Sequence, residues 1–303
     1  MSDAGIHPEA ADVVDVDIRT WVEAAAHNPA LYRDRQVTEI VLTAIGLAPS
    51  LSRTLVLKGG TLMALGFSSD RLTSDVDFTA MADPEGFEEA MTADLNRLMP
   101  RAAIQLGYLD LICRVQSVRK MPRSRDFADH AFPALLVRIG SAKRDTPEAR
   151  RLDAGAAPRV LDVEISFRDH VYSSQNLQLA QAGVAVRAFS LHELLAEKFR
   201  ALLQQPIRNR FRRQDVYDIA FLIARHALDE QDRAIIHRTL IEKCAARHMT
   251  PTAASLVDPE VRRRAEADWE TLGLEVEDLP AFDACFDRAA ELYAALPWTD
   301  RAS

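Results

Sequence analysis

The fold is decided by the stretch from Leu57 to Phe78, which opens as Leu57-Lys58-Gly59-Gly60-Thr61 and closes as Arg71-Leu72-Thr73-Ser74-Asp75-Val76-Asp77-Phe78. Just before it, the aliphatic and β-branched run Arg53–Leu57 predicts a buried strand. The glycine pair predicts a turn with permissive backbone angles, and Thr61 opens a short helix that Gly66 closes. Backbone N–H groups point outward where a turn meets the start of a helix, so this stretch predicts a place for a phosphate.

Two carboxylates follow on the next predicted strand. Acidic and apolar residues alternate in Asp75-Val76-Asp77-Phe78-Thr79, which sends both aspartates to one face of a strand. Mg²⁺ prefers such hard oxygen ligands and needs few of them when substrate phosphates supply the rest. The pattern therefore favours phosphoryl or nucleotidyl transfer, although a solvated strand with ordinary acidic residues has the same alternation.

A second acidic strand is predicted over Val160–Phe167. Its alternation places Asp162, Glu164 and Ser166 on one face and the apolar residues on the other. The alternative interpretation is a half-exposed antiparallel strand with acidic residues on its wet face.

A helix is predicted to start near Leu191, because Ser190 and Glu193 have the spacing of a capping box. Its apolar side leaves Glu197, Lys198 and Arg200 partly outside, and Lys198 on its own reads as a surface lysine. The loop that follows, Gln204–Arg213, contains four arginines. Asp215 is predicted to cap the next helix, and Asp218 to pair with an arginine of this loop.

The remaining pattern predicts mostly helices around a few strands. Helices are expected over 17–26, 35–48, 83–98 and most of 229–297, and strands within 103–118 and 132–139. Between those two strands, the charged stretch 119–129 predicts a solvated hairpin or a loop that steers a polyanionic substrate.

Composition bounds the class of protein. Apolar residues make up 48% of the 303 and charged residues 27%, which is typical of a globular protein of one or two domains. Three widely spaced cysteines argue against a disulfide framework, and no stretch approaches the roughly 20 apolar residues of a membrane helix. Since the acidic segment 1–17 also lacks the features of a leader, we expect a cytoplasmic protein without membrane association. A net charge of −8 means that any RNA binding must use a local patch, such as Lys198–Arg213.

The ordered motifs resemble a known family. Gly60-Thr61 followed by Asp75-x-Asp77 is similar to the signature of the DNA polymerase β-like nucleotidyltransferases. The fuller string from Leu57 to Phe78, with Glu197-Lys198 and Asp215-Val216-Tyr217-Asp218, resembles the AbiEii/AbiGii toxin family of type IV toxin–antitoxin systems. The resemblance covers about Thr54 to Leu222.

The resemblance implies an α+β fold. We expect a nucleotidyltransferase-like domain over residues 1–185, with a mixed sheet flanked by helices, and a mostly helical C-terminal domain over 186–303. Lys198 and Asp215 come from the second domain, so the active site is expected in a cleft between the two.

The resemblance also implies roles for particular residues. Asp75, Asp77 and Glu164 are expected to hold two Mg²⁺ ions, with Glu164 on a strand beside that of the two aspartates and Asp162 as the fallback for Glu164. The expected catalytic residues are these three carboxylates, Lys198 and Asp215. The expected nucleotide-binding residues are Lys58, Gly59, Gly60, Thr61, Arg71, Ser74, Lys198 and Arg213. Gln214 departs from the family pattern, which has a lysine at this position, and this puts that lysine's phosphate contact in doubt.

The activity implied is transfer of a nucleoside monophosphate from an NTP to a hydroxyl of RNA, with transfer RNA as the expected acceptor. Such a toxin would serve in phage defence beside an antitoxin encoded nearby, which need not bind it. Alternatives are transfer to a small molecule or a protein hydroxyl, and a silent nucleotidyltransferase fold that binds nucleotide or RNA as a regulator.

Overall fold

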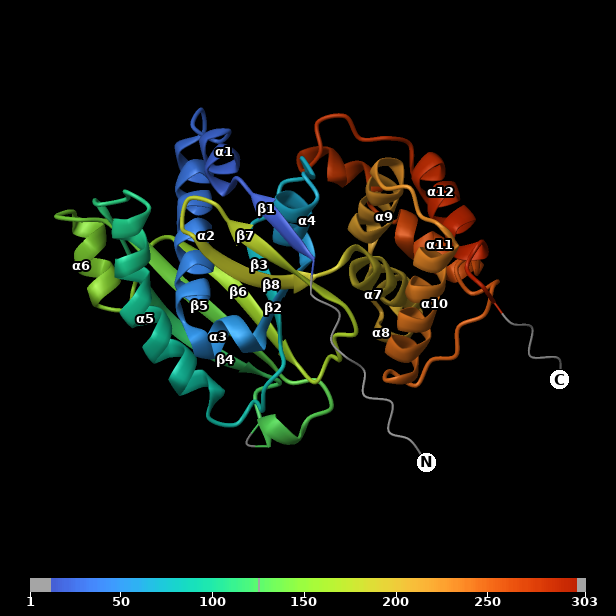
Figure 1. Ribbon diagram of the computed structural model, residues 1–303, viewed down its shortest axis with the longest axis horizontal. Helices are drawn as coiled ribbons and strands as arrows, with labels where there is room; N and C mark the ends of the chain where they lie inside the picture. The colour runs from blue at the N-terminus through green and yellow to red at the C-terminus, as the bar shows by residue number, and fades with distance from the viewer. Residues whose placement is uncertain (1–11, 125, 299–303) are drawn as a thin grey trace. The chain divides into compact units, whose positions relative to one another are not determined.

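The computed structural model describes residues 12–124 and 126–298 and divides into two compact units (Figure 1). The first, here called the sheet unit, contains the chain up to Gly66, Ser74–Asp169 and Ser174–Ala188. The second, the helical unit, contains Phe67–Thr73, His170–Ser173 and the chain from Phe189 onward. Most of the acidic N-terminal segment considered above lies outside the described residues.

The sheet unit is built on one mixed sheet in the order β1-β7-β8-β2-β3-β6-β5-β4. Its strands are β1 Val13–Val16, β2 Leu55–Lys58, β3 Asp75–Ala80, β4 Leu111–Met121, β5 Ala134–Lys143, β6 Val160–Phe167, β7 Ser174–Leu179 and β8 Val184–Phe189. The central strand β3 runs antiparallel to β2 and parallel to β6. The two acidic strands predicted from the sequence are therefore neighbours.

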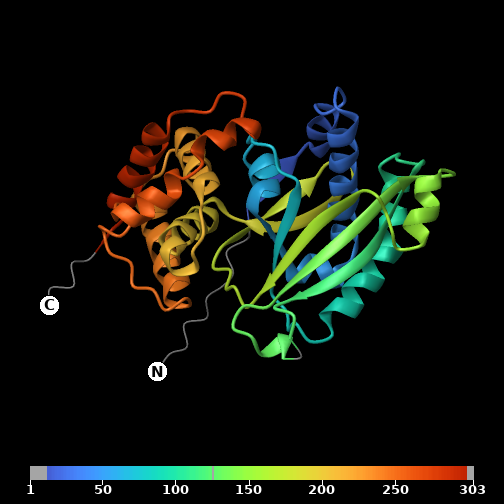
Figure 2. The same ribbon diagram turned by 180° about the vertical axis from the view of Figure 1, so that it is seen from behind.

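Helices cover one face of this sheet. The helices of the sheet unit are α1 Ile18–Glu23, α2 Pro29–Leu47, α3 Pro49–Thr54, α4 Gly59–Gly66, α5 Phe87–Gln105 and α6 Pro147–Asp153, with a short 3-10 helix at Phe127–Asp129. Figures 1 and 2 show α2, α3 and α5 on one side, and the opposite face of β6, β5 and β4 is turned to the viewer in Figure 2. We call that opposite side the open face.

The predicted alternation of β3 and β6 is confirmed. Val76 and Phe78 are fully buried, and Val163 and Ile165 are at most 3% exposed. These side chains form the core beneath α2 and α5. Removing each such side chain from water contributes about 1.5–3 kcal/mol. Because the period of a strand is two, the acidic residues between them must lie on the open face.

Several predicted boundaries were wrong by a few residues. The strand before the glycines begins at Leu55, because Pro49 opens the helix α3 and this helix takes in Arg53 and Thr54. Similarly, α2 starts at Pro29, since the side chain of Asn28 accepts hydrogen bonds from two backbone N–H groups of its first turn.

The largest error concerns α5. Asp83 forms a turn with the N–H of Glu85 and does not cap the helix, which starts at Phe87 and continues through Pro100 to Gln105. Its buried stripe continues beyond the proline with Ala102 and Ala103, so packing overrides the local penalty of Pro100. The predicted strand at Ala103 is therefore helical, and β4 begins only at Leu111.

The charged stretch after β4 belongs to a hairpin. β4 and β5 pair antiparallel up to Met121 and Ala134, and the guanidinium of Arg168 donates to the carbonyl of His130 at 2.9 Å in the connection. The hairpin interpretation is confirmed. Arg125, one of its charged residues, lies outside the described residues.

The helical unit contains α7 Leu191–Leu203, α8 Gln205–Arg208, α9 Arg213–Arg225, α10 Glu230–Ala245, α11 Pro259–Glu266 and α12 Phe282–Ala294, with a 3-10 helix at Trp269–Leu274. Ser190 caps α7 as predicted, but the Glu193 carboxylate accepts from the N–H groups of Tyr172 and Ser173, so the capping box is not closed. Cys244 and Cys285 are buried core residues, as predicted. Among the described helices, none is both long and apolar enough to cross a membrane.

Candidate active site

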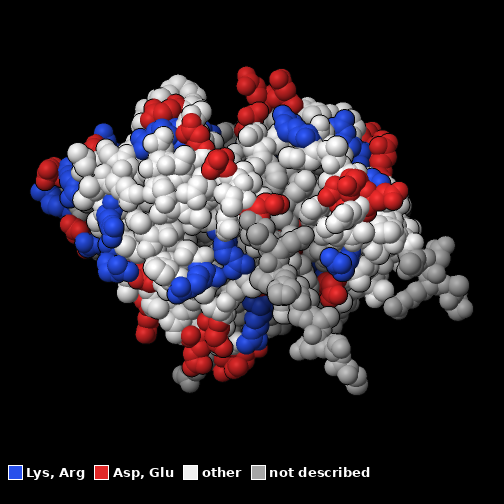
Figure 3. All heavy atoms as spheres, viewed as in Figure 1, with Lys and Arg blue, Asp and Glu red and all other residues white. Residues whose placement is uncertain are grey.

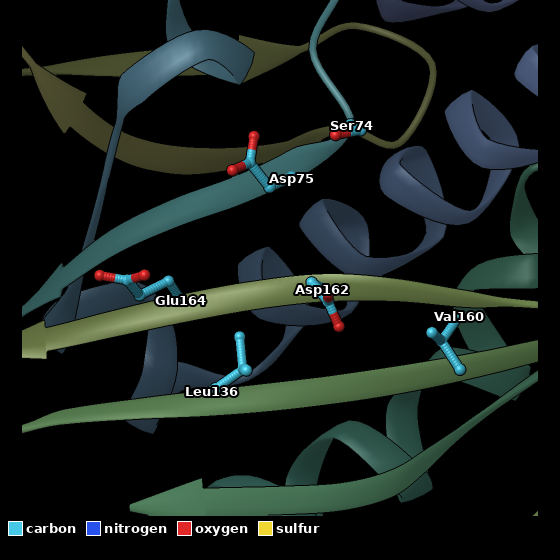
Figure 4. Close-up of a pocket in the computed structure, with 6 residues that line it drawn as sticks. All are labelled: Ser74, Asp75, Leu136, Val160, Asp162 and Glu164. Atoms are coloured by element: carbon cyan, nitrogen blue, oxygen red, sulfur yellow. The ribbon is translucent and has the colours of Figure 1, made fainter. Parts of the chain in front are cut away.

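Carboxylates from β3 and β6 form two rows on the open face. In the parallel register, Asp75 lies opposite Asp162 and Asp77 lies opposite Glu164. Figure 4 shows Asp75, Asp162 and Glu164 on these adjacent strands. They line a cavity of about 310 Å³ together with Ser74, Leu136 and Val160. The register places the three predicted metal ligands on one face of two adjacent strands, which lie about 4.8 Å apart.

The two candidates for the third carboxylate differ in their partners. Arg138 on β5 forms an ion pair with Asp162 at 3.2 Å. Within the described part of the chain, no ion pair reaches Glu164. Arg138 was missed by sequence reasoning, since only the pairing of β5 with β6 places it opposite Asp162.

The turn between β2 and α4 fits closely around Asp77. Gly59 has φ +70°, and a Cβ at this position would lie 2.1 Å from Oδ2 of Asp77. Both observations require glycine, because other residues rarely adopt this backbone conformation and have no room here. Gly60 lies in the first turn of α4. The prediction of a permissive turn is thus confirmed at Gly59.

The Thr61 hydroxyl supports β3. It is 1% exposed and donates to the carbonyl oxygen of Asp75 at 2.7 Å. The side chain therefore fixes the start of the strand that carries both aspartates.

Lys58 lies in register with Asp77 on the neighbouring strand. Its ammonium donates to the Ser166 hydroxyl at 2.7 Å and lies 3.4 Å from the Asp169 carboxylate. Ser166 also donates to Asp169 at 2.9 Å. The cation of Lys58 is therefore held by side chains of the sheet unit.

The helical unit contains a buried ionic cluster around Asp218, which is fully buried. Lys198 donates to Asp218 at 2.6 Å and to Asp215 at 3.2 Å. Arg71 contacts both oxygens of Asp218, at 2.9 and 3.1 Å, and donates to Glu275 at 2.9 Å. Two cations thus converge on one carboxylate.

The charges in this cluster stabilise one another. Burial lowers the pKa of Lys198, but the Asp218 and Asp215 carboxylates more than reverse this, and the net pKa is raised. For Asp218 burial raises the pKa, while Lys198 and Arg71 outweigh it and hold the net pKa below its usual value. Lys198 and Asp218 therefore both stay ionised near neutral pH.

Three predictions about this region were wrong. Lys198 and Arg200 are only 5% and 8% exposed, since α9 and α10 both pack on α7 and Lys198 contacts the α9 residues Asp215 and Asp218. Asp215 lies in the first turn of α9, which starts at Arg213, and does not cap it. Asp218 pairs with Arg71, which precedes it by 147 residues, and not with an arginine of the loop before α9.

Gln214, which stands where the family pattern has a lysine, also contacts this cluster. The Gln214 amide lies 3.5 Å from the Glu275 carboxylate, which in turn holds Arg71. Arg213 lies beside it, with a buried Nε that has no hydrogen-bond partner among the described residues. Glu275 was missed by sequence reasoning, because a lone glutamate so far along the chain has no local signal.

The carboxylates of the open face fit a divalent metal by their chemistry. Asp75, Asp77 and Glu164 supply hard oxygen donors, and Gly59 leaves room for Asp77 that any side chain would fill. In the described ranges, no three acidic, histidine or cysteine side chains converge into a complete ligand set. Mg²⁺ suits such a partial set, because it takes most of its ligands from water and substrate phosphates.

A family model described as "Nucleotidyl transferase AbiEii toxin, Type IV TA system" matches residues 41–288. No curated protein sequence matches significantly.

Solved structures share the fold at low sequence identity. The toxin MenT4 of Mycobacterium tuberculosis, described as a nucleotidyltransferase, is 19% identical with a TM-score of 0.56, and the match covers 93% of this chain and 90% of that one. A putative nucleotidyltransferase from Helicobacter pylori is 15% identical with a TM-score of 0.51, covering 89% and 95%. JHP933 from the same organism is 16% identical with a TM-score of 0.50, covering 89% and 92%.

Proposed function

Because the chain belongs to the AbiEii nucleotidyltransferase toxin family of type IV toxin–antitoxin systems, we propose that it uses Mg²⁺ to transfer a nucleoside monophosphate from an NTP to a hydroxyl of RNA, with transfer RNA as the best candidate. With NTP and RNA as substrates, the proposed site of action is the cytoplasm. The observation that carries the proposal is the parallel register of β3 and β6, which sets Asp77 beside Glu164 on the open face.

Asp75, Asp77 and Glu164 are the residues that we assign to the metal. Glu164 is preferred to Asp162 because Arg138 already neutralises Asp162. Bound there, Mg²⁺ would neutralise phosphate charge and lower the pKa of the acceptor hydroxyl.

The nucleotide phosphates are assigned to the turn that follows β2. Gly59 and Gly60 begin α4, where the first backbone N–H groups of a helix have no acceptor within it, and Lys58 and Ser74 supply further donors near the same carboxylates. Thr61 acts through its hydrogen bond to Asp75. In the reaction, the acceptor oxygen bonds to the α-phosphorus, the bond to the β-phosphate oxygen breaks, pyrophosphate leaves, and the acceptor proton passes to solvent.

Lys198 is assigned to the charge of the leaving pyrophosphate, and Arg213 to the nucleotide. The ammonium of Lys198 has three donors, of which Asp218 and Asp215 take two, so one remains for a phosphate oxygen. Asp215 orients this ammonium, and Arg71 holds Asp218 in place for it.

The assignment of the open face is tested by a matched pair of variants, Asp77→Asn and Asp162→Asn. Both remove one carboxylate from the same rows of the same face. We expect Asp77→Asn to lower the rate of pyrophosphate release, measured with RNA, NTP and Mg²⁺, by roughly a thousandfold or more. Asp162→Asn should stay within about threefold of the parent, because Asp162 pairs with Arg138.

The reverse order of effects would contradict the assignment. If Asp162→Asn abolished turnover and Glu164→Gln did not, Asp162 would be the third carboxylate. If all three variants kept full turnover, the open face would not be the catalytic surface.

A further inference from the structure

The connection between α8 and α9 presents a short basic surface. We call residues Arg208, Asn209, Arg210, Phe211 and Arg212 the arginine link; all five are exposed. Within the described ranges, no ion pair reaches Arg208 or Arg210, and Arg212 lies 4.0 Å from Asp215. Three guanidinium groups are thus gathered on five residues with little neutralisation.

The same link exposes an aromatic ring. Phe211 is 47% exposed, so part of its ring is open to solvent beside these arginines. The Arg264 guanidinium lies 5.7 Å from the centre of its ring and donates to the Asn209 side chain at 2.8 Å. Arg264 is itself held by Glu260 at 2.6 Å, so one face of Phe211 rests on a fixed support.

The backbone of the link is also well defined. Asn209 adopts the left-handed conformation with φ 49°, and the N–H of Arg210 donates to the carbonyl of Gln205 at 3.1 Å. Asparagine is among the residues that tolerate this conformation, so the link turns sharply without glycine.

The link leads directly to Lys198. Arg212 is 4.0 Å from Asp215, and Asp215 is 3.2 Å from the Lys198 ammonium. A phosphate chain lying on the link would therefore run toward the lysine that the proposed function assigns to the nucleotide.

Because the chain as a whole is acidic, it can bind RNA only where basic side chains are concentrated. The chain has a net charge of −8, and acidic and basic side chains are interspersed over the face drawn in Figure 3. Some other exposed arginines are neutralised, as Arg263 is by Glu260 at 2.7 Å. Arginines around a free aromatic ring are typical of surfaces that bind single-stranded nucleic acid, where the cations contact phosphates and the ring stacks on a base.

We propose that the arginine link binds a single-stranded end of the RNA acceptor, with Arg208 and Arg210 on its phosphates and Phe211 stacked on one base. This inference rests on the proposed function in taking RNA as the acceptor. It adds which surface holds this RNA, and that the bound segment of RNA is single-stranded.

The test is the affinity of the full chain for a fluorescein-labelled 12-nucleotide RNA, measured by fluorescence anisotropy without NTP over a range of salt. We expect the double variant Arg208→Gln/Arg210→Gln to weaken binding about tenfold or more and to flatten the salt dependence of log Kd by about 1.4, since each phosphate contact to a single strand contributes about 0.7. Phe211→Ala should weaken binding at least about fivefold, and Phe211→Trp should restore it.

Two controls distinguish binding at the arginine link from nonspecific attraction between arginines and RNA. Arg150→Gln/Arg151→Gln removes two exposed arginines from α6 and should leave affinity and salt dependence unchanged. A duplex of the same sequence should bind more weakly than the single strand and be insensitive to Phe211→Ala.

Unchanged RNA affinity in the Arg208/Arg210 double variant, with a far-ultraviolet circular dichroism spectrum like the parent's, would overturn the proposal and leave a protein as the partner of the link. Equal loss in the α6 control would overturn it as well. Failure of nucleotidyl transfer with every RNA would contradict the proposed function but not this binding result, because the assay contains no NTP.

Discussion

Asp218 is the carboxylate that pairs with both cations of the buried cluster in the helical unit. It is fully buried and accepts hydrogen bonds from Lys198 and Arg71. Sequence reasoning singled out Lys198 and Asp218 but assigned Asp218 the wrong arginine. The cause is physical: spacing along a helix gives neighbours three and four residues apart, whereas Arg71 reaches Asp218 only through the tertiary fold.

Arg71 supplies one of the two cations that contact Asp218, and its side chain is only 10% exposed. Replacement by alanine leaves Asp218 with one of its two cations, and breaking a buried pair in this way costs about 3–5 kcal/mol. We therefore expect Arg71→Ala to lower the free energy of unfolding in urea by about that amount.

The matched control is Arg97→Ala, which breaks an exposed pair between Arg97 and Asp94 within α5. Its expected cost is about 0–1 kcal/mol, because solvent screens the pair. Equal effects of the two substitutions would mean that Arg71 is not a structural support of the cluster.

At the scale of the element, the turn from β2 into α4 is the part that local rules predict best. A turn with permissive backbone angles was expected from the Gly-Gly pair, and Gly59 has φ +70°; the alternation of β3 follows from the period of a strand. The contact of Gly59 with Asp77 was not predictable, because it depends on the pairing of β2 with β3.

Gly59→Ala is predicted to damage the site more than the fold. The backbone cost is about 1–2 kcal/mol, and the new Cβ forces the Asp77 carboxylate to move. Since a displacement of about 1 Å in a reacting group can cost about a hundredfold, we expect at least that loss in turnover.

Gly86→Ala is the control, because Gly86 has φ +72° and open space around the position of a Cβ. It should lower the melting temperature as Gly59→Ala does and keep the turnover of the folded protein. Similar turnover in both variants would show that the fit around Asp77 is not required.

Helix α2 carries a buried acid that makes stability depend on pH. Glu39 is fully buried, accepts from the Tyr108 hydroxyl and lies 3.7 Å from Arg19. Burial raises its pKa, and Tyr108 and Arg19 only partly oppose this. The folded protein therefore keeps the Glu39 proton to a higher pH than the unfolded chain, so stability contributed by this group is present below pH 4.5 and is lost as pH rises through the folded pKa.

Glu39→Gln should remove this loss, because the amide is neutral at every pH and still accepts from Tyr108. We expect the parent to lose free energy of unfolding relative to the variant as pH rises from about 4.5 to 8, measured by urea denaturation. A difference that stayed constant with pH would contradict the raised pKa of Glu39.

At the scale of the whole molecule, the sequence was sufficient for the class of fold and for which strands carry acids. Only the family resemblance predicted that β3 and β6 are adjacent. About eighty residues separate the two strands, and no local sequence pattern pairs them. The buried clusters around Glu39 and Asp218 were out of reach for the same reason, because they join elements that are remote in the chain.

The central claim is that this nucleotidyltransferase uses the open face of its sheet to attach a nucleotide to RNA. Its most direct test is incubation of the full chain with total RNA, Mg²⁺ and each NTP labelled with ³²P at the α or the γ position, beside Asp77→Ala, followed by a denaturing gel. We predict a discrete RNA band labelled from the α position of at least one nucleotide, absent with the γ label, with the variant and after chelation of the metal. Label transferred from the γ position, or no label on RNA from any of the four nucleotides, would contradict the account.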